Sequence, residues 1–142
     1  MVRKQHRHTG KAVARVYIGA LLFLVIGLGL VCRLAPIGLP SSWSKWGGSV
    51  LWGAMFWCFA ALIIGKGSST RLFLAACLGA AASESLKLMH FPLLDALRAS
   101  SAGHFILGHQ FAWTNLAAYG IGISCMTLLA RPSNAAGTRR HN

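Results

Sequence analysis

Residues 72–86 read LFLAACLGAAASESL, and this stretch decides how the rest of the chain is interpreted. Apolar and small residues run through most of it, as in a membrane helix, until the chain's only glutamate, Glu84. A carboxylate inside such a helix has to be neutral, paired with a base or in contact with water. Ionisable residues within membrane spans usually serve a function, so Glu84 is a candidate functional residue.

The composition of the whole chain agrees with a membrane protein. The chain has 142 residues, enough for one compact unit. Hydrophobic residues make up 55% and charged residues 11%, and the mean hydropathy is +0.56. Soluble domains carry about 25% charged residues, so this chain has too few charges to cover a surface that faces water.

The net charge of +12 comes from 14 basic residues against 2 acidic ones. The basic residues flank apolar runs instead of forming a stripe on a soluble fold, which argues against binding of nucleic acid. Basic segments beside a membrane are attracted to anionic lipid headgroups by about 1 kcal/mol per residue. Membrane lipids are therefore the expected partners of the basic tails at residues 1–15 and 131–142.

Four apolar segments predict membrane spans at about residues 16–33, 48–65, 72–89 and 111–130. The first would be about 26 Å long at roughly 1.5 Å per residue, just enough for the hydrocarbon core. It lacks a small-x-small cleavage site before Arg33, so we expect it to remain as a helix and not to be a cleaved signal peptide. The predicted fold is all-α: an integral membrane four-helix bundle.

The two outer connections of this bundle differ in character. Residues 34–47 contain Trp43 and Trp46, which suit the membrane interface. Residues 90–110 contain FPLLDALRAS, which predicts a short helix, and return to apolar HFILGH before the fourth span. We expect this connection to be an outer interfacial or re-entrant segment. Both polar tails are expected to be unstructured, with an interfacial helix as the alternative for the first.

The distribution of basic residues predicts the orientation of the spans. Ten of them lie on the side of the two tails: Arg3, Lys4, Arg7, Lys11, Arg15, Lys66, Arg71, Arg131, Arg139 and Arg140. The opposite side carries three, Arg33, Lys45 and Arg98. Because cytoplasmic loops are enriched in lysine and arginine, both termini are predicted to be cytoplasmic.

This topology brings polar residues from distant parts of the sequence to one level near the outer face. The predicted outer polar cluster consists of Arg33, Ser49, Glu84, Lys87, Arg98, Trp113 and Asn115. In a functional interpretation, an externally open cleft is lined by Glu84, Lys87, Arg98 and Asn115. In a structural interpretation, outer helix ends collect polar groups because they meet headgroups and water, and Glu84 pairs with Lys87 at spacing i, i+3.

The sequence predicts no catalytic, cofactor-binding or metal-binding residues. The four cysteines lie singly in or beside apolar runs, without CxxC or Cys/His spacing, and are expected to be packing residues. His104 and His109 are five apart, which misses the i, i+4 spacing of two ligands on one helix face. Small residues predict close helix contacts at Gly79, Ser83, Gly120, Gly122 and Ser124.

Four short segments carry a resemblance by their order and spacing: GSVLW at 48–52, ESLK at 84–87, LDALRAS at 94–100 and LGHQFAWTNLAAY at 107–119. On these segments the chain resembles domain-of-unknown-function family 2809, small four-span membrane proteins of bacteria with no assigned activity. That family is similar to the VanZ-like proteins. The resemblance covers roughly residues 16–130 and implies a place in the bacterial inner membrane and a role in cell-envelope biology.

Three positions depart from the pattern of this family, which has aspartate, glutamine and aspartate there. This chain holds Ser49, Lys87 and Asn115 instead, whereas Glu84 and Arg98 match the pattern. The exchanges remove two negative charges and add one positive charge at the outer level. The resemblance therefore implies that Lys87 supplies a counter-charge to Glu84 and that the cleft favours an anionic headgroup or solute. The alternative is that an ancestral activity has drifted or been lost.

Three functions are compatible with the sequence. The first is a non-enzymatic envelope protein that binds an anionic or lipid-linked ligand at the outer leaflet. The second is a small transporter or transporter subunit, which with four spans and no internal repeat would have to form a homo-oligomer. The third is a membrane enzyme with Glu84 as acid or base. No convincing nucleophile or metal site accompanies Glu84 in the sequence, so an enzyme is not expected.

Overall fold

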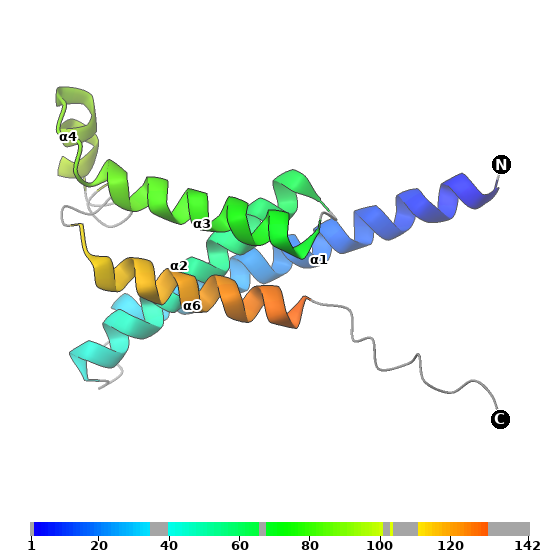
Figure 1. Cartoon of the computed structure of the whole chain (residues 1–142), viewed down its shortest axis with the longest axis horizontal. Helices are drawn as coiled ribbons and strands as arrows, with labels where there is room; N and C mark the ends of the chain where they lie inside the picture. The colour runs from blue at the N-terminus through cyan, green and yellow to red at the C-terminus, as the bar shows by residue number, and fades with distance from the viewer. Residues whose placement is uncertain (1, 35–39, 66–67, 101–102, 104–110, 131–142) are drawn as a thin grey trace.

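The computed structural model describes residues 2–34, 40–65, 68–100, 103 and 111–130, and every element in these ranges is a helix. The elements, shown in Figure 1, are α1 (Val2–Leu34), α2 (Ser41–Ile64), α3 (Ser69–Leu86), α4 (Pro92–Ala99) and α6 (Trp113–Leu129). The predicted all-α class is therefore confirmed for the described part of the chain.

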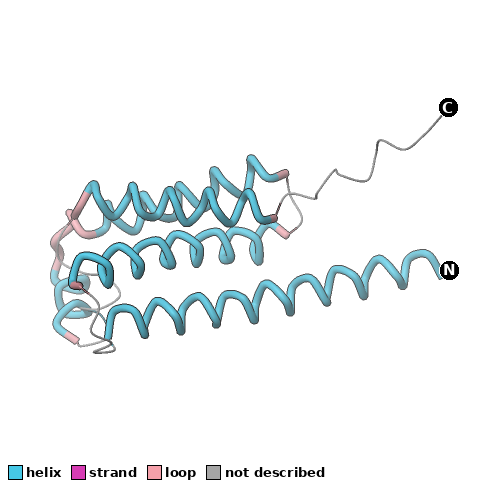
Figure 2. Tube along the Cα trace, turned by 90° about the horizontal axis from the view of Figure 1, so that it is seen from below, coloured by secondary structure: helices cyan, strands magenta, loops and turns pink. Residues whose placement is uncertain are grey.

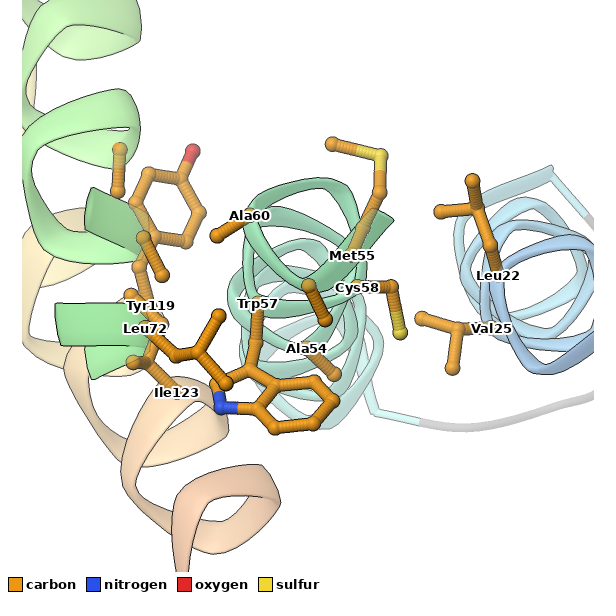
Figure 3. Packing of buried hydrophobic residues seen from close by; sticks show 13 residues of the cluster. Leu22, Val25, Ala54, Met55, Trp57, Cys58, Ala60, Leu72, Tyr119 and Ile123 are labelled. Carbon is orange, nitrogen blue, oxygen red and sulfur yellow. The ribbon is translucent and has the colours of Figure 1, made fainter. Parts of the chain in front are cut away.

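Helix α2 is the centre of the bundle, because it packs against α1, α3 and α6, while α3 also packs against α6. Figure 2 shows α1 on one side of α2, with α3 and α6 on the other. In the core, Leu22 and Val25 of α1 face Cys58 of α2, and Tyr119 and Ile123 of α6 lie on the opposite side of α2 (Figure 3). The apolar core thus fixes α6 and α3 relative to α2.

Two glycines let α2 and α6 approach closely. A Cβ atom at Gly53 would overlap the backbone of Tyr119, and one at Gly122 would overlap the carbonyl of Val50. Small residues permit such contacts between helix backbones, and the close contact predicted at Gly122 is present. The contact predicted at Gly120 is wrong, because a Cβ atom there would have no neighbour within 4 Å among the described residues.

Among the described residues, two helices contain segments long and apolar enough to cross a membrane, Val13–Cys32 in α1 and Lys45–Ile64 in α2. Helix α3 has 18 residues and α6 has 17. Large apolar side chains also point outward from the bundle, as in Phe23, which is 78% exposed, and Ile63, which is 80% exposed. At this coarse level, the two apolar segments agree with a membrane protein.

Two helices begin earlier than predicted. The N-terminal tail is helical and not unstructured, because α1 begins at Val2. The tail contains no proline, and extending an existing helix avoids the cost of nucleating one. Helix α2 begins at Ser41, directly after Pro40, so Lys45 and Trp46 belong to a helix and not to a loop.

Helix α3 ends earlier than predicted. It stops at Leu86, because the next residues form a turn in which the amide of Met89 donates to the carbonyl of Leu86. The predicted short helix is present as α4, with Pro92 in its first turn, where proline is well tolerated. The predictions for residues 104–110 and 131–142 concern parts of the chain outside the description.

Candidate functional site

One end of the bundle collects most of the predicted polar residues. The end of α3, the starts of α2 and α6, and α4 all lie there (Figure 1). Glu84 and Lys87 come from the end of α3. Ser49 lies near the start of α2, and Asn115 lies near the start of α6. Arg33 is near the end of α1, where the side chains are outside the description.

Glu84 is completely buried and faces α6. Its Oε1 atom accepts a hydrogen bond from Lys87 Nζ at 2.7 Å and another from the Tyr119 hydroxyl at 3.1 Å. The ion pair predicted by the i, i+3 spacing is therefore present, with the side chain of Lys87 only 10% exposed. Oε2 is buried and has no hydrogen-bond partner among the described residues. We call Glu84, Lys87 and Tyr119 the Glu84 cluster.

Arg98 is also buried, and it donates hydrogen bonds at the end of α3 instead of contacting Glu84. Its Nη2 atom donates to the carbonyl of Leu86 at 2.6 Å, and Nη1 donates to the carbonyl of Met89 at 2.8 Å and to Asp95 Oδ1 at 3.0 Å. Leu86 is the last residue of α3 and Met89 lies in the turn that follows, and a guanidinium can donate to both carbonyls at once. Arg98 thereby fastens α4 to α3.

The burial of these two residues corrects the expected cleft. Glu84 is 0% exposed and Arg98 is 1% exposed, so neither side chain lines an open cleft in this structure. Both side chains make hydrogen bonds inside the protein, which offsets part of the cost of their desolvation. The sequence could not show which atoms these two side chains contact.

A pocket of about 80 Å³ lies between the starts of α2 and α6. Its lining residues are Lys45, Trp46, Ser49, Thr114, Asn115 and Ala118, and we call it the Lys45 pocket. It brings together two predicted residues, Ser49 and Asn115. The pocket offers an ammonium group, two hydroxyls and an amide, which together can donate hydrogen bonds to an anion.

The charge of Lys45 is not balanced within the described part of the chain. The sequence has only two acidic side chains, and each is engaged with other bases. Glu84 holds Lys87, while Asp95 holds Arg98 and lies 3.4 Å from His90 Nδ1. No ion pair of Lys45 is found among the described residues. The Lys45 pocket therefore has a net positive charge.

The pocket and the Glu84 cluster are one helical turn apart. Asn115 in the pocket and Tyr119 in the cluster are four residues apart on α6, so they lie on the same side of that helix. On α2, Ser49 is likewise four residues from Gly53, which contacts the backbone of Tyr119. The close contact of the two helices thus lies between the pocket and Glu84.

Four lining residues were not predicted as site residues, and two of them, Lys45 and Thr114, carry an ammonium or a hydroxyl group. Lys45 is four residues before Ser49, a spacing that shares one helix face, but only if residues 41–47 are interpreted as helix. Trp113, the first residue of α6, lies outside the pocket. It is 77% exposed, and its ring packs edge-on against Phe111 at 5.0 Å between centroids.

No group of three metal-ligating side chains that could hold a metal ion occurs within the described ranges. Cys58 is buried, Cys32 and Cys77 are of intermediate exposure, and Cys125 is exposed.

The sequence model of one protein family matches residues 38–123, which include the Lys45 pocket and the Glu84 cluster. The family is described as "Protein of unknown function (DUF2809)". The chain belongs to this family. The match begins just before α2 and ends within α6, so the part shared with the DUF2809 family is the part that builds both polar groups, without α1. No solved structure matches the chain.

Proposed function

We propose that this DUF2809 protein is a multi-pass protein of the bacterial inner membrane that binds an anionic, lipid-linked group in the Lys45 pocket. The observation that carries the proposal is the unbalanced charge of Lys45 beside Ser49, Thr114 and Asn115. Such a site suits an anion, because the ammonium is positively charged and the ammonium, hydroxyl and amide groups all donate hydrogen bonds to anionic oxygens.

The proposed membrane placement has four spans, formed by α1, α2, α3 and α6, with both termini in the cytoplasm. The spans belong to a membrane domain at residues 16–130, between basic cytoplasmic tails at 1–15 and 131–142. At 1.5 Å per residue, α3 and α6 are about 26 Å long, which is near the lower limit for a span. The excess of basic residues on the tail side supports this orientation.

The size of the pocket favours a headgroup over a whole solute. Pockets for complete small molecules measure about 300–1,000 Å³, whereas the Lys45 pocket measures about 80 Å³. It has room for one phosphate-sized group while the rest of a lipid would lie outside it. Transport of a solute through this site would need a much larger passage.

The buried state of Glu84 disfavours the enzymatic alternative. A general acid or base has to come within hydrogen-bonding distance of a substrate. Glu84 is 0% exposed, and its Oε1 atom is engaged with Lys87 and Tyr119. Binding at Lys45 therefore accounts for more of the geometry than acid–base chemistry at Glu84.

Native mass spectrometry of the full chain tests this function. The protein is released from detergent micelles that contain equal amounts of phosphatidylglycerol and phosphatidylcholine. We expect bound phosphatidylglycerol to predominate, and Lys45→Gln to reduce it by about tenfold, as the loss of one charge-assisted hydrogen bond would. The matched control is Arg15→Gln, which removes an exposed base of α1 far from the pocket.

Equal losses of phosphatidylglycerol in the Lys45 and Arg15 variants would contradict the proposal, because they would indicate general attraction to the basic protein. A competition arm distinguishes the two sources of an anionic group. If inorganic phosphate displaces phosphatidylglycerol at equal concentration, the pocket recognises a soluble anion and the lipid-linked part of the proposal is wrong.

A further inference from the structure

We propose that α4 is an interfacial helix. It lies along the external surface of the inner membrane and inserts Leu93 and Leu97 among the lipid acyl chains. This inference rests on the membrane placement proposed above, but not on the Lys45 pocket. It assigns a lipid-binding surface to a segment that belongs to neither the Lys45 pocket nor the Glu84 cluster.

The direction of α4 fits an interfacial helix. It runs across the direction of the other helices at the end of the bundle, upright in Figure 1 and seen nearly end-on in Figure 2. If the bundle helices cross the membrane, α4 lies roughly parallel to its surface. Amphipathic helices that bind membranes adopt this orientation, with the apolar face buried about 5–10 Å into the boundary between headgroups and acyl chains.

The two faces of α4 have different neighbours. Leu94 and Arg98 are four residues apart and buried, and the hydrogen bonds of Arg98 fasten this face to the end of α3. Leu93 and Leu97 are also four residues apart, but they are 70% and 52% exposed. Burial of two leucines in acyl chains would contribute about 1.5–3 kcal/mol each in the fully buried limit.

The apolar face of α4 continues an apolar surface of α3. Leu74, Leu78 and Leu86 recur on one face of α3 and are all exposed. Leu88, Met89 and Phe91 are exposed in the turn that joins this face to α4. A membrane span presents such a surface to lipid. Because the apolar surface of α3 continues onto α4, we infer that lipid also contacts α4.

Two features favour lipid over a second protein chain as this occupant. Exposed apolar side chains surround the bundle, as Phe23 on α1 and Ile63 on α2 show, and do not form one bounded patch of the kind typical of a protein interface. The polar groups of the α4 region, His90 and Asp95, remain 66% and 47% exposed, as expected where an interfacial helix meets water.

Photolabelling of the full chain in vesicles tests the inference. The vesicles consist of phosphatidylcholine, part of which carries a diazirine group on an acyl chain, and labelled residues are mapped by mass spectrometry. We expect label at Leu93 and Leu97 but not at the buried Leu94, and label at Phe23 as the reference for a membrane span. The Leu93→Asn/Leu97→Asn variant should lose several-fold of the label in residues 92–99 and keep it at Phe23.

Each other outcome overturns a defined part of the inference. Label at Phe23 without label at Leu93 and Leu97 would show that α4 faces water, and the membrane placement would stand. Crosslinks from these leucines to a second copy of the chain, in place of lipid, would show a protein interface. Absence of label at all three positions would overturn the membrane placement itself. Because both leucines are exposed, the Asn variant should keep the helix content of the wild type.

Discussion

Glu84 is buried between a base from the turn after α3 and a hydroxyl from α6. Lys87 supplies an opposite charge from the turn after α3, and Tyr119 supplies a hydroxyl from α6. A buried ion pair often adds little net stability, because both charges are desolvated, but the removal of one partner leaves an uncompensated charge. At the residue scale, the contribution of Lys87 to the free energy of unfolding is therefore expected to depend on Glu84.

Replacement of Lys87 tests this relation. We predict that Lys87→Gln lowers the free energy of unfolding by about 3–5 kcal/mol, because Glu84 stays buried without its counter-charge. The double variant Glu84→Gln/Lys87→Gln should recover much of this loss, since neither charge remains. Denaturant unfolding of the full chain in lipid nanodiscs measures both values. Wild-type stability of Lys87→Gln would show that Lys87 is not the counter-charge of Glu84.

The sequence identified Glu84 and its pairing with Lys87, because a lone acid in an apolar run is conspicuous and the spacing is local. It could not identify Tyr119, which is 35 residues away and looks like part of an apolar span. It also missed Lys45 as a site residue, because helix α2 extends into the region interpreted as a loop. Local spacing predicts local pairs, but contacts between helices depend on how each helix is rotated in the bundle.

At the scale of elements, the contact of α2 with α6 depends on two glycines, and it lies between the Lys45 pocket and Glu84. We predict that Gly122→Ala destabilises the fold by about 1–3 kcal/mol, because the added Cβ atom overlaps the backbone at Val50 and forces the helices apart. The matched control is Gly120→Ala, whose methyl group has open space in the described structure.

Thermal unfolding of the two alanine variants distinguishes helix contact from helix propensity. Alanine favours helix over glycine by about 1 kcal/mol, so Gly120→Ala should be neutral or slightly stabilising. A similar effect of both substitutions would contradict the close contact at Gly122.

The attachment of α4 depends on the forked guanidinium of Arg98. Lysine has a single ammonium group and cannot reach two carbonyls and a carboxylate in the same geometry. We predict that Arg98→Lys raises amide hydrogen exchange in residues 94–99 by about tenfold or more, as α4 separates from α3 more often. Asp95→Asn, which removes charge from a half-exposed acceptor, should have a much smaller effect. Unchanged exchange in Arg98→Lys would show that the apolar contacts of Leu94 are sufficient.

The elements themselves were largely predictable, because apolar runs and the FPLLDALRAS pattern specify helices directly. Their ends were not, since the N-terminal extension of α1 has no apolar pattern and the end of α3 depends on the turn that Arg98 caps from twelve residues away. The Lys45 pocket and the attachment of α4 both lie at helix ends. The site was therefore less predictable than the fold.

On the scale of the whole molecule, charge is distributed unevenly. Both carboxylates are engaged with bases, which leaves a net charge of +12 for partners outside the chain. In the membrane placement proposed above, most basic residues belong to the cytoplasmic side and would meet anionic lipids of the inner leaflet. Lys45 lies at the end of the bundle where α2 and α6 begin, in the pocket that we propose to hold a single anionic group.

The most direct measurement is a solid-state NMR distance between lysine nitrogen and lipid phosphorus. The full chain, with 15N in its lysine side chains, is placed in vesicles that contain phosphatidylglycerol. We predict a 15N signal that is strongly dephased by 31P, corresponds to Lys45 Nζ in contact with a phosphate oxygen, and disappears in Lys45→Gln. A Lys45 signal unaffected by phosphorus would contradict binding of an anionic headgroup in the pocket.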